Sequence, residues 1–205
     1  MILNKPEKYD EVQVNQEFER LELGGHKGII KSVEEYTSQT SGNTSLKVEV
    51  DTDKEDKQPN YFQKQYDENP DMNKKWSTGA TKYVSLKQEE NCIKMLKALI
   101  TAVENSNKNF VYDWKKDTNQ LIGKKVGLVF GLEEYENDKG EIKTTTKLTN
   151  FRSLDKIDEV KIPRVKLLDS TFIEYEEYKN KAQIKNENAY SEYDTAVEID
   201  SNFLD

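Results

Sequence analysis

The side chains that most often carry enzyme chemistry are scarce in this sequence. It contains one histidine, His26, and one cysteine, Cys92, whereas a structural zinc site uses four ligands drawn mainly from these two residue types. Gly123 precedes Lys124 and Lys125, but a phosphate-binding loop also needs a lysine followed by serine or threonine at a helix start. Acidic residues are numerous, yet they form no cluster on a predicted element that would support metal-assisted hydrolysis. The sequence therefore predicts a protein that is not an enzyme and that holds no metal or cofactor.

Aromatic side chains that stand beside lysines offer a second kind of chemistry. A single strand of nucleic acid is held by positive groups that neutralise its phosphates and by rings on which its bases stack, each stack contributing roughly 1 to 3 kcal/mol. We expect bases to stack on Tyr61, Phe62, Tyr66, Trp76 and Tyr135. We expect phosphate contacts from Lys64, Lys74, Lys75, Lys82, Lys143, Lys147 and Arg152. Core packing is the alternative for each ring, and Trp76 is the strongest candidate because its polar loop supplies few apolar neighbours.

The overall charge opposes nucleic-acid binding, but the distribution of charge does not. The formal net charge is −8, and phosphate binding depends on lysine and arginine. Residues 170–205 contain nine acidic and three basic residues, a net charge of −6, which leaves only −2 on residues 1–169. The body is therefore close to neutral and can contain a basic groove, whereas the end of the chain is strongly acidic.

Composition and length predict one modest globular body with polar extensions, since 34% of the 205 residues are hydrophobic and 34% are charged. A single cysteine cannot form an intramolecular disulfide, and the N-terminus has neither the basic nor the apolar region of a secretion signal. No apolar run approaches the length that spans a membrane. We therefore expect a protein of the reducing cytoplasm that makes no contact with a membrane.

The candidate residues need a scaffold, and alternating apolar residues predict that it consists mainly of strands. The stretch Leu121–Ser153 reads as a hairpin, because alternate residues of Val126–Leu132 are apolar before a turn at residues 137–140. We assign the apolar face of its first strand to the core, with Gly127 and Gly131 allowing that strand to bend, and its second strand to binding. Further strands are predicted at His26–Tyr36, Leu46–Val50, Tyr61–Tyr66, Thr81–Leu86 and, as an edge strand, Val160–Val165.

Strict alternation also assigns the faces of two early strands. Leu46, Val48 and Val50 alternate with charged residues, so we expect them to form the buried side of their strand. In the preceding strand, the same alternation places Ile30 on one face and Val33 on the other.

One helix is predicted at Glu89–Asn105. Ile93, Leu96, Ile100 and Val103 recur there at helical spacing, and their face should pack against the sheet. Residues 67–78 are rich in asparagine, aspartate and proline, which is typical of a polar loop.

These elements predict three parts of the chain. Residues 1–23 form an extended N-terminal arm, and residues 24–168 form the folded domain. Residues 169–205 have too few aliphatic side chains for a core, so we expect an acidic and largely disordered tail. Its tip carries the candidate partner-binding residues Asp200, Phe203, Leu204 and Asp205.

Five stretches of the sequence, in the order in which they follow each other, carry a resemblance to a known family. They are Phe18–Val33, Tyr61–Tyr66 followed by Lys74–Trp76, Leu99–Asn105 leading to Trp114, Leu121–Tyr135 and Phe151–Ser153. Together they span most of residues 18–165. In this order the chain resembles a family of small single-stranded DNA-binding proteins from the replication or recombination modules of phages of low-GC Gram-positive bacteria.

The resemblance implies an OB-like β-barrel with one packed helix and a flexible acidic tail. It also implies sequence-tolerant binding of single-stranded DNA during phage replication or recombination, in the cytoplasm of the host. In such proteins the tail recruits replication or recombination partners and competes with DNA for the basic groove. This chain departs from the pattern, because Leu204 and Asp205 follow the aromatic Phe203 instead of a terminal Pro-Phe.

A second hypothesis comes from the acidity of the chain. A phage factor that binds a protein, such as an anti-defence or recombinase-accessory factor, needs no direct contact with nucleic acid, and an acidic surface can mimic DNA toward its partner. The sequence leaves open whether the chain forms a homo-oligomer and whether it prefers DNA or RNA.

Overall fold

The computed structural model describes residues 5, 7 and 19–182, and most of its regular structure is β-strand. The strands are β1 Gly24–Thr37, β2 Thr44–Thr52, β3 Thr81–Ser85, β4 Lys125–Glu136, β5 Ile142–Arg152, β6 Val165–Lys166 and β7 Phe172–Ile173. The helices include α1 Tyr61–Glu68 and α2 Glu90–Ser106, and the 3-10 turns are η1 Thr78–Ala80, η2 Thr118–Leu121 and η3 Leu154–Lys156. The prediction of a mainly β protein is confirmed, and so is the hairpin, which is formed by β4 and β5.

All seven strands belong to one mixed sheet that is not closed into a barrel. Its order is β3-β2-β1-β4-β6-β7, and β5 pairs with the other edge of β4. The pairing is antiparallel except between β4 and β6, which are parallel. Within the described residues β3 and β5 do not pair as strands. Instead η1 lies against β5, where a Cβ atom added to Gly79 would be 2.6 Å from the carbonyl oxygen of Thr146.

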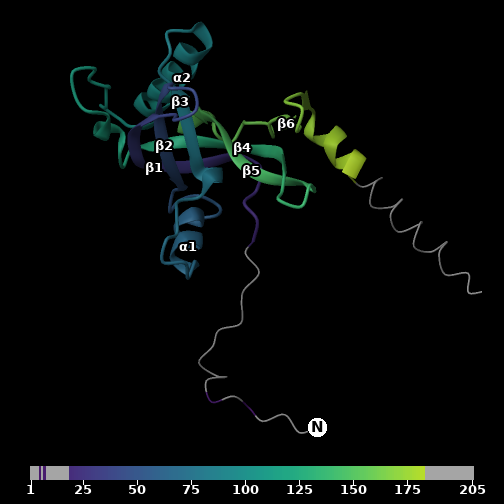
Figure 1. Cartoon of the computed structure of the whole chain (residues 1–205). Coiled ribbons are helices and arrows are strands. Elements are labelled where there is room, and N and C mark those ends of the chain that lie inside the picture. Colours follow the sequence, from purple (N-terminus) through teal and green to yellow (C-terminus); the bar gives the residue numbers. More distant parts are fainter. Residues whose placement is uncertain (1–4, 6, 8–18, 183–205) are drawn as a thin grey trace, which may run out of the picture.

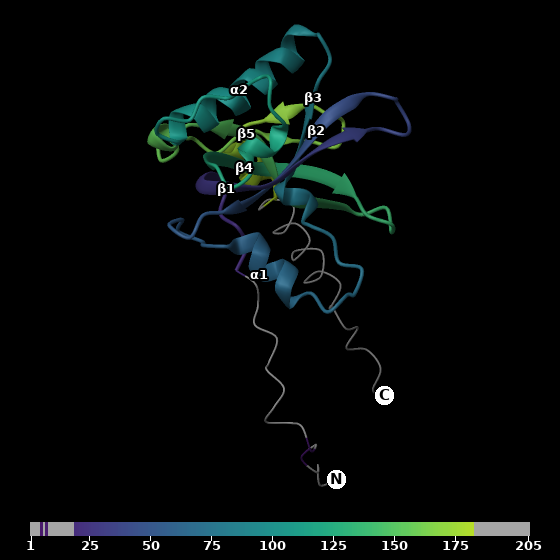
Figure 2. The same ribbon diagram turned by 90° about the vertical axis from the view of Figure 1, so that its left-hand side faces the viewer.

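The two helices lie at opposite ends of the sheet, as Figures 1 and 2 show from two directions. Helix α2 packs on β3, β4 and β5, and Leu99, Ile100 and Val103 are buried there. The predicted helix and most of its apolar face are therefore confirmed. Ile93 is the exception, because it lies in the first turn of α2 and is 46% exposed.

A bulge in β1 corrects the predicted faces of that strand. Leu46, Val48 and Val50 of β2 are buried as expected, and Ile30 of β1 pairs with Val50. The register then shifts between Ile30 and Ser32, so that Val33 pairs with Val48 and is also buried. One extra residue in a strand returns the following side chain to the same face.

Strand β4 is buried on both faces. Close packing on its outer face explains the presence of Gly127 and Gly131 better than the predicted bend of the strand does. Its inner face packs in the core, whereas its outer face is covered by the segment that follows η3. A Cβ atom at Gly127 would lie 2.9 Å from the Cδ1 of Ile157, and one at Gly131 would lie 3.1 Å from the Cβ of Pro163. The glycines therefore allow residues 157–163 to approach the strand closely.

Residues Tyr61–Tyr66 are helical, so the prediction of a strand there is wrong. The N-terminus of α1 is capped by β2, because the Asp51 carboxylate accepts the N–H of Phe62 at 2.9 Å and the Thr52 hydroxyl accepts that of Tyr61 at 2.9 Å. Burial raises the pKa of Asp51, although the backbone N–H donors around it act in the opposite direction. Caps supplied from another strand satisfy the free N–H groups of a helix that the local sequence does not signal.

The two ends of the folded region differ from the predicted arm, edge strand and tail. Leu21 is buried, and its N–H donates to the Tyr61 hydroxyl at 3.0 Å. The predicted edge strand at Val160–Val165 is reduced to the two residues of β6, which pairs with β7. Residues 175–182, in the first part of the expected tail, are helical. The predicted tail tip at Asp200, Phe203, Leu204 and Asp205 lies outside the described residues, as does most of the arm.

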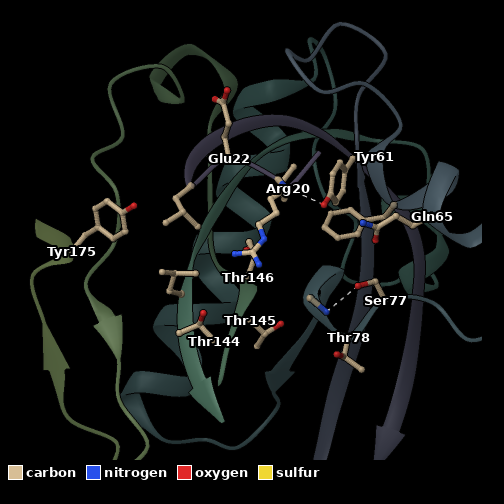
Figure 3. A pocket seen from close by; sticks show the side chains of 15 residues that line it. Arg20, Glu22, Tyr61, Gln65, Ser77, Thr78, Thr144, Thr145, Thr146 and Tyr175 are labelled. Atoms are coloured by element: carbon tan, nitrogen blue, oxygen red, sulfur yellow. Dashed lines mark hydrogen bonds between the residues drawn. The ribbon is translucent and has the colours of Figure 1, made fainter. Parts of the chain in front are cut away.

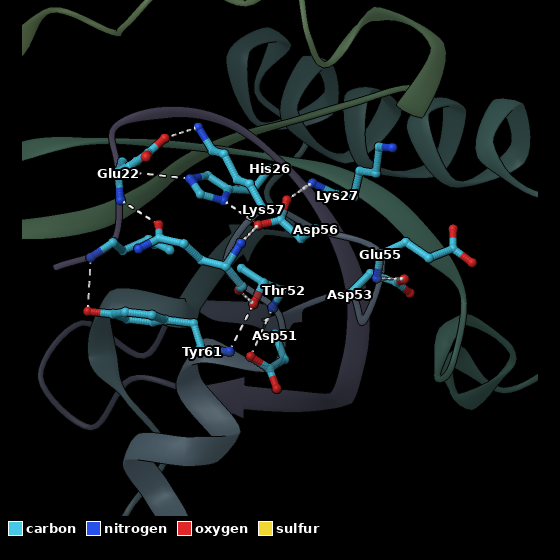
Figure 4. Close-up of polar contacts among 12 residues, drawn as sticks. Glu22, His26, Lys27, Asp51, Thr52, Asp53, Glu55, Asp56, Lys57 and Tyr61 are labelled. Atoms are coloured by element: carbon cyan, nitrogen blue, oxygen red, sulfur yellow. Dashed lines mark hydrogen bonds and ion pairs between the residues drawn. The ribbon is translucent and has the colours of Figure 1, made fainter. Parts of the chain in front are cut away.

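A buried hydrogen bond between His26 and Asp56 joins β1 to the connection after β2 (Figure 4). The Nδ1 of His26 is 2.8 Å from the Oδ1 of Asp56, and its Nε2 is 3.0 Å from the carbonyl oxygen of Glu22. Both ring nitrogens of His26 are therefore held by oxygen atoms of neighbouring residues. Asp56 also accepts the N–H groups of Lys27 at 2.7 Å and Gln58 at 2.9 Å. Burial alone would raise the pKa of Asp56, but the hydrogen bonds from His26, Gln58 and Lys27 outweigh it and lower that pKa.

Candidate nucleic-acid interface

Four side chains from three parts of the chain form what we call the stacked cluster: Lys31, Tyr66, Lys74 and Trp76. The ring centroids of Tyr66 and Trp76 are 5.7 Å apart, with an interplanar angle of 40°. The Nζ of Lys74 lies 4.7 Å from the centre of the Tyr66 ring, and the Nζ of Lys31 lies 5.9 Å from that of Trp76. Two adjacent rings thus each carry a cation, within the range of a cation–π contact.

The cluster is held in place by the sheet and by α1. The Nε1 of Trp76 donates to the carbonyl oxygen of Val50 at 3.1 Å, and its ring packs partly against the core. Lys31 comes from the β1 bulge, and the Nζ of Lys74 is 3.4 Å from the carbonyl oxygens of Asp67 and Asn69. The expectation that Trp76 has few apolar neighbours is wrong, because its ring packs against the hydrophobic core and against Tyr66 of α1.

The other predicted stacking residues occupy different environments. Phe62 is 5% exposed and packs against Phe130 with ring centroids 5.6 Å apart, which leaves no ring face for a base. Tyr61 is half-buried with its ring edge against Phe62, and its hydroxyl is already an acceptor. Tyr135 is 43% exposed but lies on the hairpin, near the end of β4.

The predicted basic residues divide into separate groups. Lys64 and Lys75 are exposed beside the stacked cluster in sequence, on α1 and on the loop that follows it. Lys82 of β3 is half-buried, and burial lowers its pKa. Three more lie on β5: Lys143 pairs with Glu141 at 3.2 Å, Lys147 donates to the carbonyl oxygen of Thr78 at 3.3 Å, and Arg152 pairs with Gly127 at the far end. The structure therefore brings Tyr66, Lys74 and Trp76 together and leaves Arg152 apart.

Two exposed tyrosines on the sheet lie close together outside the set of predicted stacking residues, although Tyr83 follows the predicted phosphate contact Lys82 in sequence. Tyr36 of β1 and Tyr83 of β3 are 42% and 50% exposed, with ring centroids 5.0 Å apart. Lys47 of β2 lies between their strands and is paired with Glu49 at 2.6 Å. Tyr36 was not predicted, and the alternation of polar and apolar residues along its strand is the signal that could have identified it.

A groove of about 580 Å³ is lined by residues of α1, η1 and β5 (Figure 3). Its walls come from the segment before β1, from α1, from η1 and from the hairpin, and Tyr175 closes one side. Polar side chains predominate: Arg20, Gln65, Ser77, Thr78, Thr144, Thr145, Thr146 and Tyr175. Gln65 and Tyr66 are neighbours on α1, and Trp76 precedes Ser77, so adjacent residues of the chain build the groove and the stacked cluster.

Metal and membrane sites receive no support from the geometry. Within residues 5, 7 and 19–182, no three histidine, cysteine or acidic side chains are grouped so that they could hold a metal ion. In the same part of the chain, no helix combines the length and the apolar character needed to cross a membrane.

Comparison with models of known protein families finds no matching family, and a search of curated proteins finds no match. The stacked cluster and the groove near it are the features of the described residues that bear on function.

Proposed function

We propose that the protein binds single-stranded DNA without strong sequence preference and that it is not an enzyme. The observation that carries this proposal is the stacked cluster, where the Tyr66 and Trp76 rings lie 5.7 Å apart and each carries a lysine. A base that stacks on either ring displaces the ammonium group from the ring face, and the lysine is then free to contact a phosphate. Exposed Lys64 and Lys75 add positive charge nearby. Stacking with charge neutralisation is the general mode of binding to unstructured strands.

The connectivity of the sheet supports the proposal. A β1-β2-β3 meander is followed by α2 and then by a β4–β5 hairpin whose first strand returns to β1. We assign this order to an OB-like fold, a partly open five-stranded barrel that binds oligonucleotides on the face of its second and third strands. Tyr36 and Tyr83 stand at one end of β2 and the stacked cluster at the other, roughly 17 Å away at about 3.3 Å per residue.

The charge distribution supports a second part of the proposal, which concerns the tail. Residues 183–205 carry six acidic residues and one basic residue, against a nearly neutral body. In the proposed function this segment competes with DNA for the lysines, and its tip at Phe203 and Leu204 recruits replication or recombination proteins. The site of action is the cytoplasm of a phage-infected host.

Substitution of Trp76 tests the proposal. Trp76→Ala removes a stacking surface, so we expect its affinity for a fluorescent oligo-dT to fall roughly 5- to 150-fold, which corresponds to one base stack. Trp76→Phe loses the hydrogen bond to Val50 but keeps a ring, and we expect it to retain most of the affinity. Phe172→Ala is the control, because Phe172 is 52% exposed on β7 and takes no part in the cluster. Equal affinity of Trp76→Ala and the wild type, both folded, would contradict the proposal.

A specific observation favours a second candidate function, binding of a protein partner. In the connection between α2 and β4, Val111 is 77% exposed, Trp114 is 70% exposed and Ile122 is 42% exposed. Exposed apolar groups of this kind are typical of contact surfaces between proteins. A pull-down from nuclease-treated host lysate tests it, with Val111→Ser/Trp114→Ser as the control bait. Capture that depends on these two residues, together with absence of DNA binding, would favour this function over the first.

A further inference from the structure

The groove beside the stacked cluster is lined by hydrogen-bond donors that the protein itself does not use. The Arg20 guanidinium and the hydroxyls of Thr78, Thr144, Thr145 and Thr146 make no hydrogen bond or ion pair within the described residues. Figure 3 shows the Arg20 side chain extending into the groove toward Thr146. Unused donors that converge on one space provide ready contacts for a ligand rich in acceptors.

The charge of the groove is positive and is not neutralised from its walls. The one carboxylate of its lining belongs to Glu22, which is paired with Lys57. The hydrogen bond to Lys57 lowers the pKa of Glu22, so that this carboxylate stays ionised and engaged. Arg20 is therefore the one uncompensated charge of the groove, and its planar fork matches the oxygens of a phosphate or carboxylate.

Main-chain donors add to the side chains. Strand β5 pairs only with β4 in the described part of the chain, so its other edge faces η1 without a strand partner. Thr144, Thr145 and Thr146 lie on this stretch of β5 and line the groove. A free strand edge presents N–H groups in addition to the threonine hydroxyls.

We propose that this groove binds the phosphodiester backbone of the DNA strand whose neighbouring base stacks on the cluster. The inference deepens the proposed function and rests on it. A backbone contact fits because the lining offers one guanidinium and several hydroxyls, the groups that bind phosphate oxygens in nucleic-acid complexes. The position fits as well, because Trp76 of the cluster and Thr78 of the groove are two residues apart in the chain, so one DNA strand can contact both.

Salt-dependent binding of two probes tests the inference. The probes are an oligo-dT and an abasic sugar-phosphate oligomer of the same length, each titrated with the full chain by fluorescence anisotropy. Arg20→Gln removes one phosphate contact, so we expect about tenfold weaker binding to both probes and a salt slope smaller by about 0.7. Arg164→Gln is the matched control, because Arg164 is exposed near Phe172 outside the groove and its loss changes the total charge equally. Trp76→Ala should weaken only the oligo-dT complex.

The outcomes separate this inference from the proposed function. If Arg20→Gln matches Arg164→Gln in affinity and slope, or if it weakens only the oligo-dT complex, the backbone assignment is overturned and DNA binding stands. If the wild type binds neither probe at low salt, the proposed function and the inference both fall. A free phosphate-containing anion is the alternative ligand of the groove, and inorganic pyrophosphate, added at constant ionic strength as a competitor of oligo-dT, tests for it. Displacement of oligo-dT by micromolar pyrophosphate would identify a free-anion site and overturn the assignment to a strand.

Discussion

The buried pair of His26 and Asp56 makes a sharp prediction about stability. Their side chains are 0% and 3% exposed, and the hydrogen bond between them is 2.8 Å long. Asp56→Ala leaves the imidazole without its partner and also leaves the N–H groups of Lys27 and Gln58 without their acceptor. Removing one partner of a buried charged group and leaving its hydrogen-bond donors unpaired typically costs about 3 to 5 kcal/mol. We expect a loss of that size, a large share of the roughly 5 to 15 kcal/mol by which a domain is stable.

The same pair predicts how the loss depends on pH. The folded-state pKa of Asp56 lies below the ordinary value of 3.8, so the ionised carboxylate stabilises the folded state. This contribution is fully present above pH 3.8 and is lost as the pH falls through the lowered pKa. The difference in unfolding free energy between the wild type and Asp56→Ala should therefore shrink in acid, as the pH falls below 3.8 and through the lowered pKa of Asp56.

Urea denaturation followed by circular dichroism measures this difference. With a slope of about 2 kcal/mol per molar urea, the midpoint of Asp56→Ala should fall by about 1.5 to 2.5 M at neutral pH. Asp71→Ala is the control, because the Asp71 carboxylate accepts only the N–H of Asn73 in an exposed loop and its loss should cost about 0.5 kcal/mol. A loss below about 1 kcal/mol for Asp56→Ala at neutral pH would refute the assigned role of the pair.

Two further predictions concern packing and charge. Gly25→Ala should lower the urea midpoint strongly, since its Cβ atom would lie 2.1 Å from the carbonyl oxygen of Ile157; the expected cost is about 3 kcal/mol. Gly123 has φ +76°, and a Cβ atom added there would meet no atom within 4 Å, so we expect Gly123→Ala to cost about 1 kcal/mol of stability from backbone strain alone. Equal losses of stability for the two variants would contradict the close approach of Gly25 to Ile157. Deletion of residues 183–205 removes a net charge of −5 and should tighten oligo-dT binding about threefold at low salt, as measured by anisotropy, with no gain at high salt. Unchanged or weaker binding at low salt would argue against competition by the tail.

The sequence predicted those elements whose signal is local and periodic. Leu46, Val48 and Val50 alternate along β2, and Leu99, Ile100 and Val103 follow the helical period of α2, so each pattern reports the face that the sheet or helix buries. Each pattern also repeats over enough residues to outweigh local exceptions.

The features that sequence reasoning missed depend on residues far apart in the chain. Helix α1 begins with Tyr61 and Phe62, which favour strands, and its caps come from Asp51 and Thr52 at the end of β2. The β1 bulge shifts the register of β1 against β2 by one residue, and the alternation of side chains within β1 alone could not indicate this shift. The stacked cluster was predicted in part, because Tyr66, Lys74 and Trp76 stand near each other in sequence. Lys31 and Arg20 were missed because only the fold brings them to the cluster and the groove.

The central claim is that the protein binds single-stranded DNA, and a salt titration with matched probes tests it most directly. The full chain would be titrated into a fluorescent oligo-dT and into a duplex of the same length, from about 20 to about 300 mM salt, with anisotropy as the readout. We predict tighter binding to the single strand, with the logarithm of affinity falling linearly with the logarithm of salt, by about 0.7 for each phosphate contact. Absence of binding to the single strand at the lowest salt, or equal affinity for the duplex, would contradict the claim.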